Sequence, residues 1–175
     1  TNYKFGKFVV NGNNDIAVSA GYSSAPNQLS YHFIKFDNDF NVIQKNANPD
    51  IFANLQPLTT ISFNTFITVL KNRKYIFGFF TSDGFPGTDS ARIITASYTD
   101  PFTSSVPTWV NRNKYKDPFQ GIDHNTIVDL KADAENNFYV LGMTNSYSFT
   151  LRKHSEDGNL LWQRKIPNTS YAQDR

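Results

Sequence analysis

The chain carries an internal repeat of about 59 residues, and this repeat limits the folds open to it. The segment Lys35–Gln44 (KFDNDFNVIQ) aligns with Lys153–Trp162 (KHSEDGNLLW), 118 residues further on, which is twice 59. Candidate second strands begin near Ile16, Tyr75 and Phe138, at steps of 59 and 63 residues. A near-constant period of this size is typical of proteins that stack copies of one supersecondary unit. The sequence therefore predicts three copies of such a unit.

Each copy has the pattern of four short β-strands. In the third copy the four β-prone runs span residues 126–131, 138–141, 148–153 and 160–163. Polar turn sequences, DAENN at 133–137 and EDGN at 156–159, separate two pairs of them. Aromatic residues make up 15% of the chain and charged residues only 18%, which suits half-buried strands. Four antiparallel strands in each repeated unit predict the blades of a β-propeller.

We therefore expect an all-β protein with three four-stranded antiparallel blades, at about residues 3–46, 62–113 and 126–166. Closed propellers contain about 4–8 blades, so three blades predict a partial ring. The chain begins at Thr1, without an initiator methionine or a signal peptide, which favours a piece of a larger propeller. Pairing with a second copy and an open array are the alternatives. Further blades or another subunit are expected to cover the faces of the end blades.

Charge and composition exclude several classes of partner and site. The chain has 17 Lys and Arg against 15 Asp and Glu, a net charge of +2, so no nucleic-acid partner is expected. No apolar run approaches the roughly 18–20 residues of a membrane span, and none is predicted. Cysteine is absent, which excludes disulfides, thiolate metal ligands and a cysteine nucleophile.

One stretch of the third copy resembles a known repeat. Val128-Asp129, followed by residues 137–146 (NFYVLGMTNS), is similar to the bacterial seven-bladed SBBP propeller repeats, with their Val-Asp, Tyr-Val-x-Gly and Thr-Asn-Ser steps. Residues 157–162 (DGNLLW) resemble the blade end of those repeats and of quinoprotein-like propellers, whereas the first copy has Gln44 in place of the tryptophan. The resemblance implies an exported bacterial protein, at the cell surface, in the periplasm or outside the cell. It implies no activity, because propellers host many unrelated functions.

Patterns that suggest a metal site have a simpler interpretation as turns. Asp37-x-Asp39-x-Asn41 has the alternating oxygen ligands of a calcium loop, but lacks the glycine and the later carboxylate that such a loop needs. A hairpin turn explains the same residues, and also explains Asp133–Asn137. We predict no metal site here.

The histidines and tryptophans are expected to be structural. His32, His124 and His154 show no metal-site spacing, and we expect them to be exposed or half-buried. Trp109 and Trp162 end their blades, where packing between neighbouring sheets is the default interpretation. Stacking on a quinone or a sugar is the alternative. No catalytic residue and no cofactor is predicted.

If a ligand binds, we expect it on an axial face of the propeller, where loops converge. Residues 81–90 form the longest polar insertion within a hairpin, and they contribute Asp83 and Asp89. Asp123 and His124 precede the first strand of the third copy. These four residues are the predicted ligand-binding residues, for a glycan, a peptide or a protein partner.

The functional prediction is a non-enzymatic binding or scaffolding module. The sequence offers no nucleophile elbow, no phosphate-binding glycine loop and no paired general acid and base. The alternative is part of a propeller enzyme, quinoprotein-like or a hydrolase, whose active site needs blades that this sequence does not contain.

Overall fold

The computed structural model describes residues 2–25, 28–47, 60–82, 92–99, 107–114, 126–143 and 149–166. Within these ranges the backbone forms β-strands and turns but no helix. The strands make three antiparallel sheets of four strands each, and within every sheet the strands lie side by side in chain order. The predicted all-β class and the three four-stranded units are confirmed.

Each sheet is a simple meander. Sheet I consists of β1 (Asn2–Val10), β2 (Ile16–Ala25), β3 (Gln28–Phe36) and β4 (Val42–Ala47). Sheet II consists of β5 (Thr60–Val69), β6 (Lys74–Ser82), β7 (Arg92–Thr99) and β8 (Trp109–Lys114). Sheet III consists of β9 (Thr126–Ala132), β10 (Phe138–Met143), β11 (Phe149–His154) and β12 (Leu160–Ile166).

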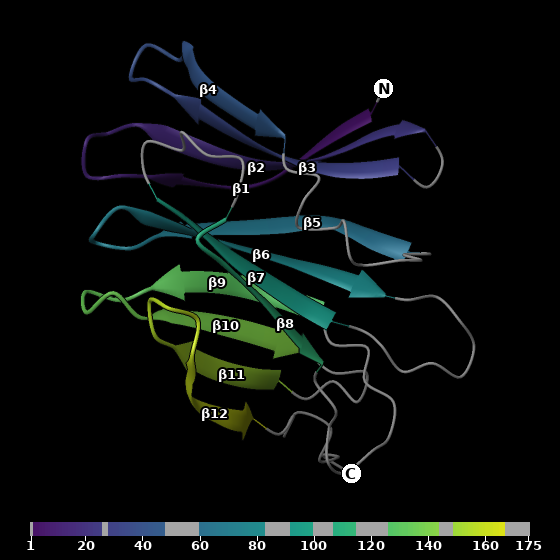
Figure 1. Ribbon diagram of the computed structural model, residues 1–175, viewed down its shortest axis with the longest axis vertical. Helices are drawn as coiled ribbons and strands as arrows, with labels where there is room; N and C mark the ends of the chain where they lie inside the picture. The colour runs from purple at the N-terminus through teal and green to yellow at the C-terminus, as the bar shows by residue number, and fades with distance from the viewer. Residues whose placement is uncertain are drawn as a thin grey trace, which may run out of the picture.

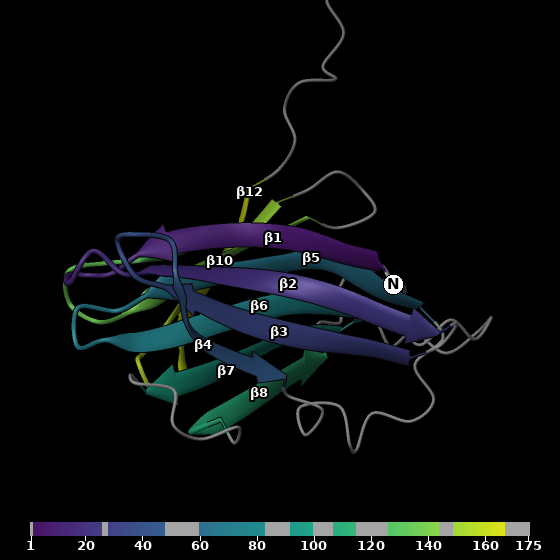
Figure 2. The same cartoon turned by 90° about the horizontal axis from the view of Figure 1, so that it is seen from above.

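The three sheets stack face to face, with sheet II in the middle (Figures 1 and 2). The first strands of the sheets are neighbours, since β1 contacts β5 and β5 contacts β9. Stacked meanders joined along their first strands are the arrangement of consecutive propeller blades. We call the face of sheets II and III that is turned toward the preceding sheet the front face, and the opposite face the back face. In sheet I the front face is the one turned away from sheet II.

Five hairpin turns share one backbone conformation. They span residues 11–15, 37–41, 70–74, 133–137 and 155–159. In each turn the N–H of the first residue donates to the carbonyl of the fifth, at 2.8–3.0 Å. The fourth residue has a positive φ of 62–82° and is a glycine only at Gly158. All five turns project from the same side of the stack, at the left of Figure 1.

Side chains at the start of these turns explain the calcium-like spacing. Asp37 Oδ1 accepts hydrogen bonds from the backbone N–H groups of Asp39 and Asn41, each at 2.9 Å. Asp133 Oδ1 accepts the equivalent bonds from Glu135 and Asn137, again at 2.9 Å. The carboxylates therefore cap their own turns, and the interpretation of both patterns as turns is confirmed.

Two apolar clusters fill the two spaces between the sheets. The cluster between sheets I and II contains Ala17, Phe33, Ile67, Tyr75, Phe77, Phe79, Ile94, Ala96 and Tyr98. The cluster between sheets II and III contains Phe66, Leu70, Ile76, Ile93, Ile127, Leu130, Phe138 and Val140. Burial of apolar surface contributes roughly 25 cal/mol per Å², so these two layers are the main source of stability.

The first two sheets approach closely near Gly6. A Cβ atom at this position would lie 2.3 Å from the carbonyl oxygen of Thr65 and 2.8 Å from Ser19 Oγ. The Thr65 hydroxyl donates to Ser19 Oγ at 2.9 Å, and Ser19 in turn bonds the backbone of Lys7. The lack of a side chain at Gly6 therefore permits this polar contact between β1, β2 and β5.

Candidate interaction surfaces

The four predicted ligand-binding residues lie outside the described residues. Asp83 and Asp89 belong to the segment after β6, and Asp123 and His124 to the segment before β9. Their role as a ligand site stays a prediction. In the described residues, the candidate interaction surfaces are the contacts between neighbouring sheets and the outer faces of sheets I and III.

Two histidines are buried in the stack, not exposed or half-buried as the sequence suggested. His32 on β3 is 7% exposed and His154 on β11 is 1% exposed. The prediction of exposure was wrong for His154 because its side chain lies on the front face of sheet III, against sheet II, a position that strand alternation alone does not identify. The expected structural role of both histidines agrees with this burial.

Trp109 joins sheet II to sheet III. Its ring stacks on Phe138 with centroids 5.9 Å apart, and Phe138 stacks on His154 at 5.0 Å. The indole N–H donates to the carbonyl of Glu156 at 3.0 Å. Two positions further along β8, Asn111 Nδ2 donates to the carbonyl of Gly158 at 2.7 Å. Side-chain donors of one sheet thus bind the β11–β12 turn of the next, and the predicted packing role of Trp109 is confirmed.

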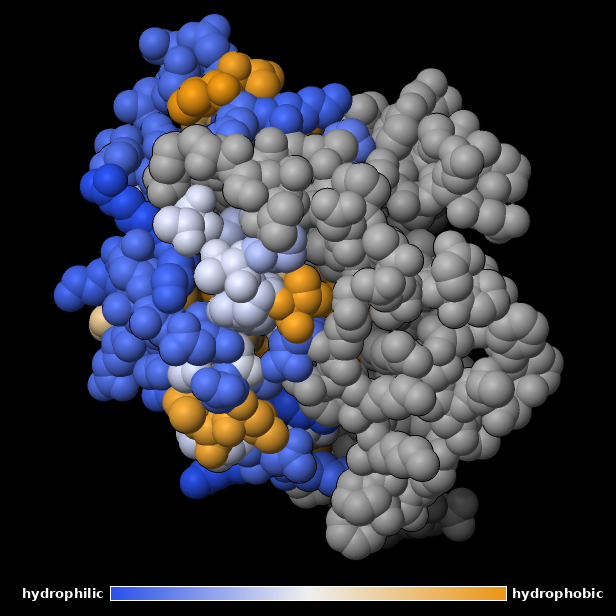
Figure 3. Space-filling view, in the orientation of Figure 1, coloured by the Kyte–Doolittle hydropathy of each residue, from blue (hydrophilic) through white to orange (hydrophobic). Residues whose placement is uncertain are grey.

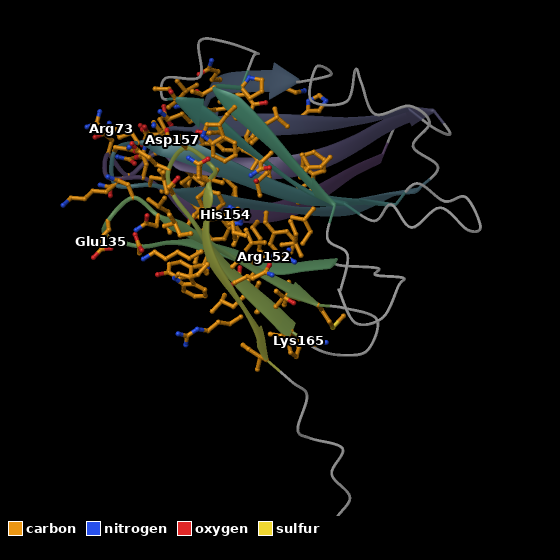
Figure 4. The ribbon with its side chains drawn as sticks, turned by 60° about the horizontal axis from the view of Figure 1, so that its bottom comes forward. Arg73, Glu135, Arg152, His154, Asp157 and Lys165 are labelled. Carbon is orange, nitrogen blue, oxygen red and sulfur yellow. The ribbon has the colours of Figure 1, made fainter. Side chains whose placement is uncertain are left out.

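The environment of His154 favours its neutral form. Burial of the ring lowers the pKa of His154, the Gly158 carbonyl opposes this change, and Arg152 adds to it. Nδ1 lies 3.1 Å from the Gly158 carbonyl oxygen, and because a carbonyl can only accept, Nδ1 carries the proton. Figure 4 shows His154 and Arg152 on the same strand, within the stack.

Acidification should weaken the fold through His154. An unfolded chain has a histidine pKa of about 6.5, above that of the buried ring, so it binds protons more readily as the pH falls below 6.5. The free energy of unfolding should be highest above that pH and decrease below it, as urea titrations from about pH 7.5 to 5.5 will measure.

The matched variant for this test is His154→Phe, which keeps an aromatic ring against Phe138 and removes the titrating group. It should flatten the pH dependence without abolishing it, because burial also lowers the pKa of His32. An unchanged slope in His154→Phe would show that this ring does not couple folding to pH.

The turns also bond to one another across the sheets. Asn72, in the turn of sheet II, donates its backbone N–H to Asn136 Oδ1 at 3.0 Å and its side-chain amide to Glu156. Toward sheet I, Arg73 Nη2 donates to Asn13 Oδ1 at 3.1 Å. Figure 4 shows Arg73, Glu135 and Asp157 on the side of the stack where the turns project. These contacts hold the turns in one polar rim.

The front face of sheet I is largely apolar and is exposed at Phe8 and Val10, whereas Ala20 and His32 on the same face are buried. Phe8 is 67% exposed, whereas Ile67 and Leu130, at the equivalent places in β5 and β9, are 3% and 2% exposed. The strand registers establish this equivalence through the pairs Phe8↔Val18, Ile67↔Phe77 and Leu130↔Val140. The front face of sheet I carries Phe8, Val10, Ile16, Val18, Ile34 and Phe36.

The back face of sheet III is the second open end. Trp162 pairs with Lys153 as Trp109 pairs with Ser97, so the two tryptophans hold equivalent places. No sheet among the described residues follows β12, and Trp162 is 37% exposed. Its ring meets Tyr139 edge-on at 5.9 Å, and the Arg164 guanidinium lies over it. Figure 3 shows hydrophobic surface over β4 at the top of the view and over β12 near the bottom.

A charged pair recurs on the back faces of sheets I and III. Lys35 is buried between sheets I and II with its Nζ 2.9 Å from Asp15, and this contact lowers the pKa of Asp15. At the equivalent place on sheet III, Lys153 Nζ lies 3.1 Å from Asp133. Bonds to Tyr139 and Asp133 raise the pKa of Lys153 well above its usual range. The exposed back face of sheet III therefore carries the same kind of lysine–aspartate pair as the covered back face of sheet I.

Comparisons with known proteins do not identify a family for this chain. No protein-family model matches the chain, and no curated protein matches it either. In the ranges that the structure describes, no group of three His, Cys, Asp or Glu residues could hold a metal ion. The same ranges contain no helix with the length and hydropathy to cross a membrane.

Proposed function

We propose that this protein is a non-enzymatic binding and scaffolding module, part of an exported bacterial propeller protein, that joins other β-sheets through the two ends of its stack. The SBBP-like stretch in the third repeat supports the exported, bacterial assignment. The two open sheet faces support the scaffolding role.

The difference in exposure between equivalent residues carries this proposal. Phe8 is 67% exposed at a place where the other two sheets keep Ile67 and Leu130 almost wholly buried. Exposed apolar patches on a sheet face mark interaction sites. The stack therefore has two faces that we expect another sheet to cover.

Binding of the apolar dye ANS to the dilute chain tests the proposal. ANS fluorescence should rise on binding, because the dye reports exposed hydrophobic surface. Phe8→Glu and Trp162→Glu should each lower the signal, and the double variant should lower it most. Lys71→Glu, an exposed change in the β5–β6 turn, is the matched control and should leave it unchanged. Equal dye binding by the double variant and the native chain would contradict the proposal.

A further inference from the structure

We propose that the partner of each open face is a second copy of this chain, with sheet III of one copy packed on sheet I of the other. This inference rests on the proposed function and names the partner. Two copies would then form two identical contacts and one closed body of six sheets. Six lies within the range of about 4–8 blades found in closed propellers.

The contact between sheets II and III shows what the back face of sheet III can bind. From β8, Trp109 and Asn111 donate side-chain hydrogen bonds to carbonyls of the 155–159 turn. On β12, Trp162 and Arg164 hold the equivalent places, two residues apart, and both side chains are donors. A sheet that docks there must therefore present a turn of the same kind between its third and fourth strands.

Sheet I presents that turn. Its turn at 37–41 has the same backbone hydrogen bonds as 155–159 and the same positive φ at the fourth residue, here Phe40. Sheet II has a longer segment at this place, because β7 ends at Thr99 and β8 begins only at Trp109. Sheet I is the described sheet whose front face is not covered by another sheet, and its turn matches.

The side chains of the two faces are also compatible. Where sheet III places Phe138 and His154 against Trp109, sheet I places Ile16 and Phe36, so Trp162 of a second copy would meet an apolar surface. Phe40 is 73% exposed and stands at the place of Gly158, where a Cβ would lie 3.1 Å from the tryptophan ring, so Trp162 of a second copy must sit further from this turn than Trp109 does from its own. Sheets I and III of one chain cannot meet, since sheet II lies between them (Figure 1).

Sedimentation equilibrium with two charge variants tests the arrangement. The native chain should sediment as a dimer, and Phe8→Glu and Trp162→Glu should each raise the dimer dissociation constant on the order of 30-fold or more. Lys71→Glu should have no effect. A mixture of Phe8→Glu and Trp162→Glu should associate again, because one of its two contacts then joins an unaltered back face to an unaltered front face.

Each other outcome overturns the inference. A native monomer that still binds ANS would leave the open faces without this partner and the proposed function intact. Polymers that lengthen with concentration would refute a closed pair, since a head-to-tail contact that fails to close gives filaments. A Phe8→Glu dimer would indicate a back-to-back contact. Circular dichroism checks folding, and Val10→Glu and Arg164→Glu replace either variant that does not fold.

Discussion

Phe138→Ala should lower the free energy of unfolding by about 3–5 kcal/mol, the cost typical of removing a buried aromatic ring. The Phe138 side chain is wholly buried and lies between the rings of Trp109 and His154. Its loss opens a cavity between sheets II and III and removes two ring contacts together. Urea denaturation at a fixed protein concentration measures the change.

Leu161→Ala is the control for this substitution. Leu161 lies on β12 and is 51% exposed, so its truncation should change the free energy of unfolding by no more than about 0.5 kcal/mol. Equal losses in the two variants would show that the Trp109–Phe138–His154 stack does not hold sheets II and III together.

Gly158→Ala should destabilise the protein by about 2–5 kcal/mol, for two separate reasons. With φ at +82°, any other residue at this position meets a conformational cost of about 1–2 kcal/mol. An added Cβ would also lie 3.1 Å from the ring of Trp109, and overpacking of this kind costs about 1–3 kcal/mol. Thermal and urea unfolding should both report the loss.

A double-mutant cycle separates the two causes. In a Trp109→Ala background the added methyl group has no ring to meet, so Gly158→Ala should cost only the conformational part, about 1–2 kcal/mol. Gly12→Ala is the simple control, since a Cβ there would have no atom within 4 Å. If Gly158→Ala costs the same with and without Trp109, the close packing of the indole on this glycine is not what limits the position.

Repeat spacing predicted the fold well, because turn chemistry and strand alternation are local properties. The steps of 59 and 63 residues aligned Ile16, Tyr75 and Phe138, and the structure places all three directly after the same kind of turn. The substitution of Gln44 for tryptophan also has a physical basis. Trp109 faces the 155–159 turn of the next sheet, whereas the sheet that follows β4 has a different connection at that place.

Other features depend on contacts that a sequence does not display. Simple alternation in the first strand of the third repeat would put Ile127 and Leu130 on opposite faces, yet both are 2% exposed. A bulge at Val128 shifts the register and turns both side chains toward sheet II. The burial of His154 and the inter-sheet bonds of Asn72 likewise arise from packing between units far apart in the chain.

The strand connectivity within each sheet bears on how such a chain can grow in evolution. Every strand pairs only with its neighbours in sequence, so duplication of one unit inserts a complete sheet without rerouting any existing strand. A copy of sheet III would carry both the turn that accepts hydrogen bonds from Trp109 and Asn111 and a following strand with donor side chains at Trp162 and Arg164. A gene can therefore gain copies first and change the contacts between sheets later, and Gln44 and Trp109 show that equivalent positions in two sheets can carry different contacts.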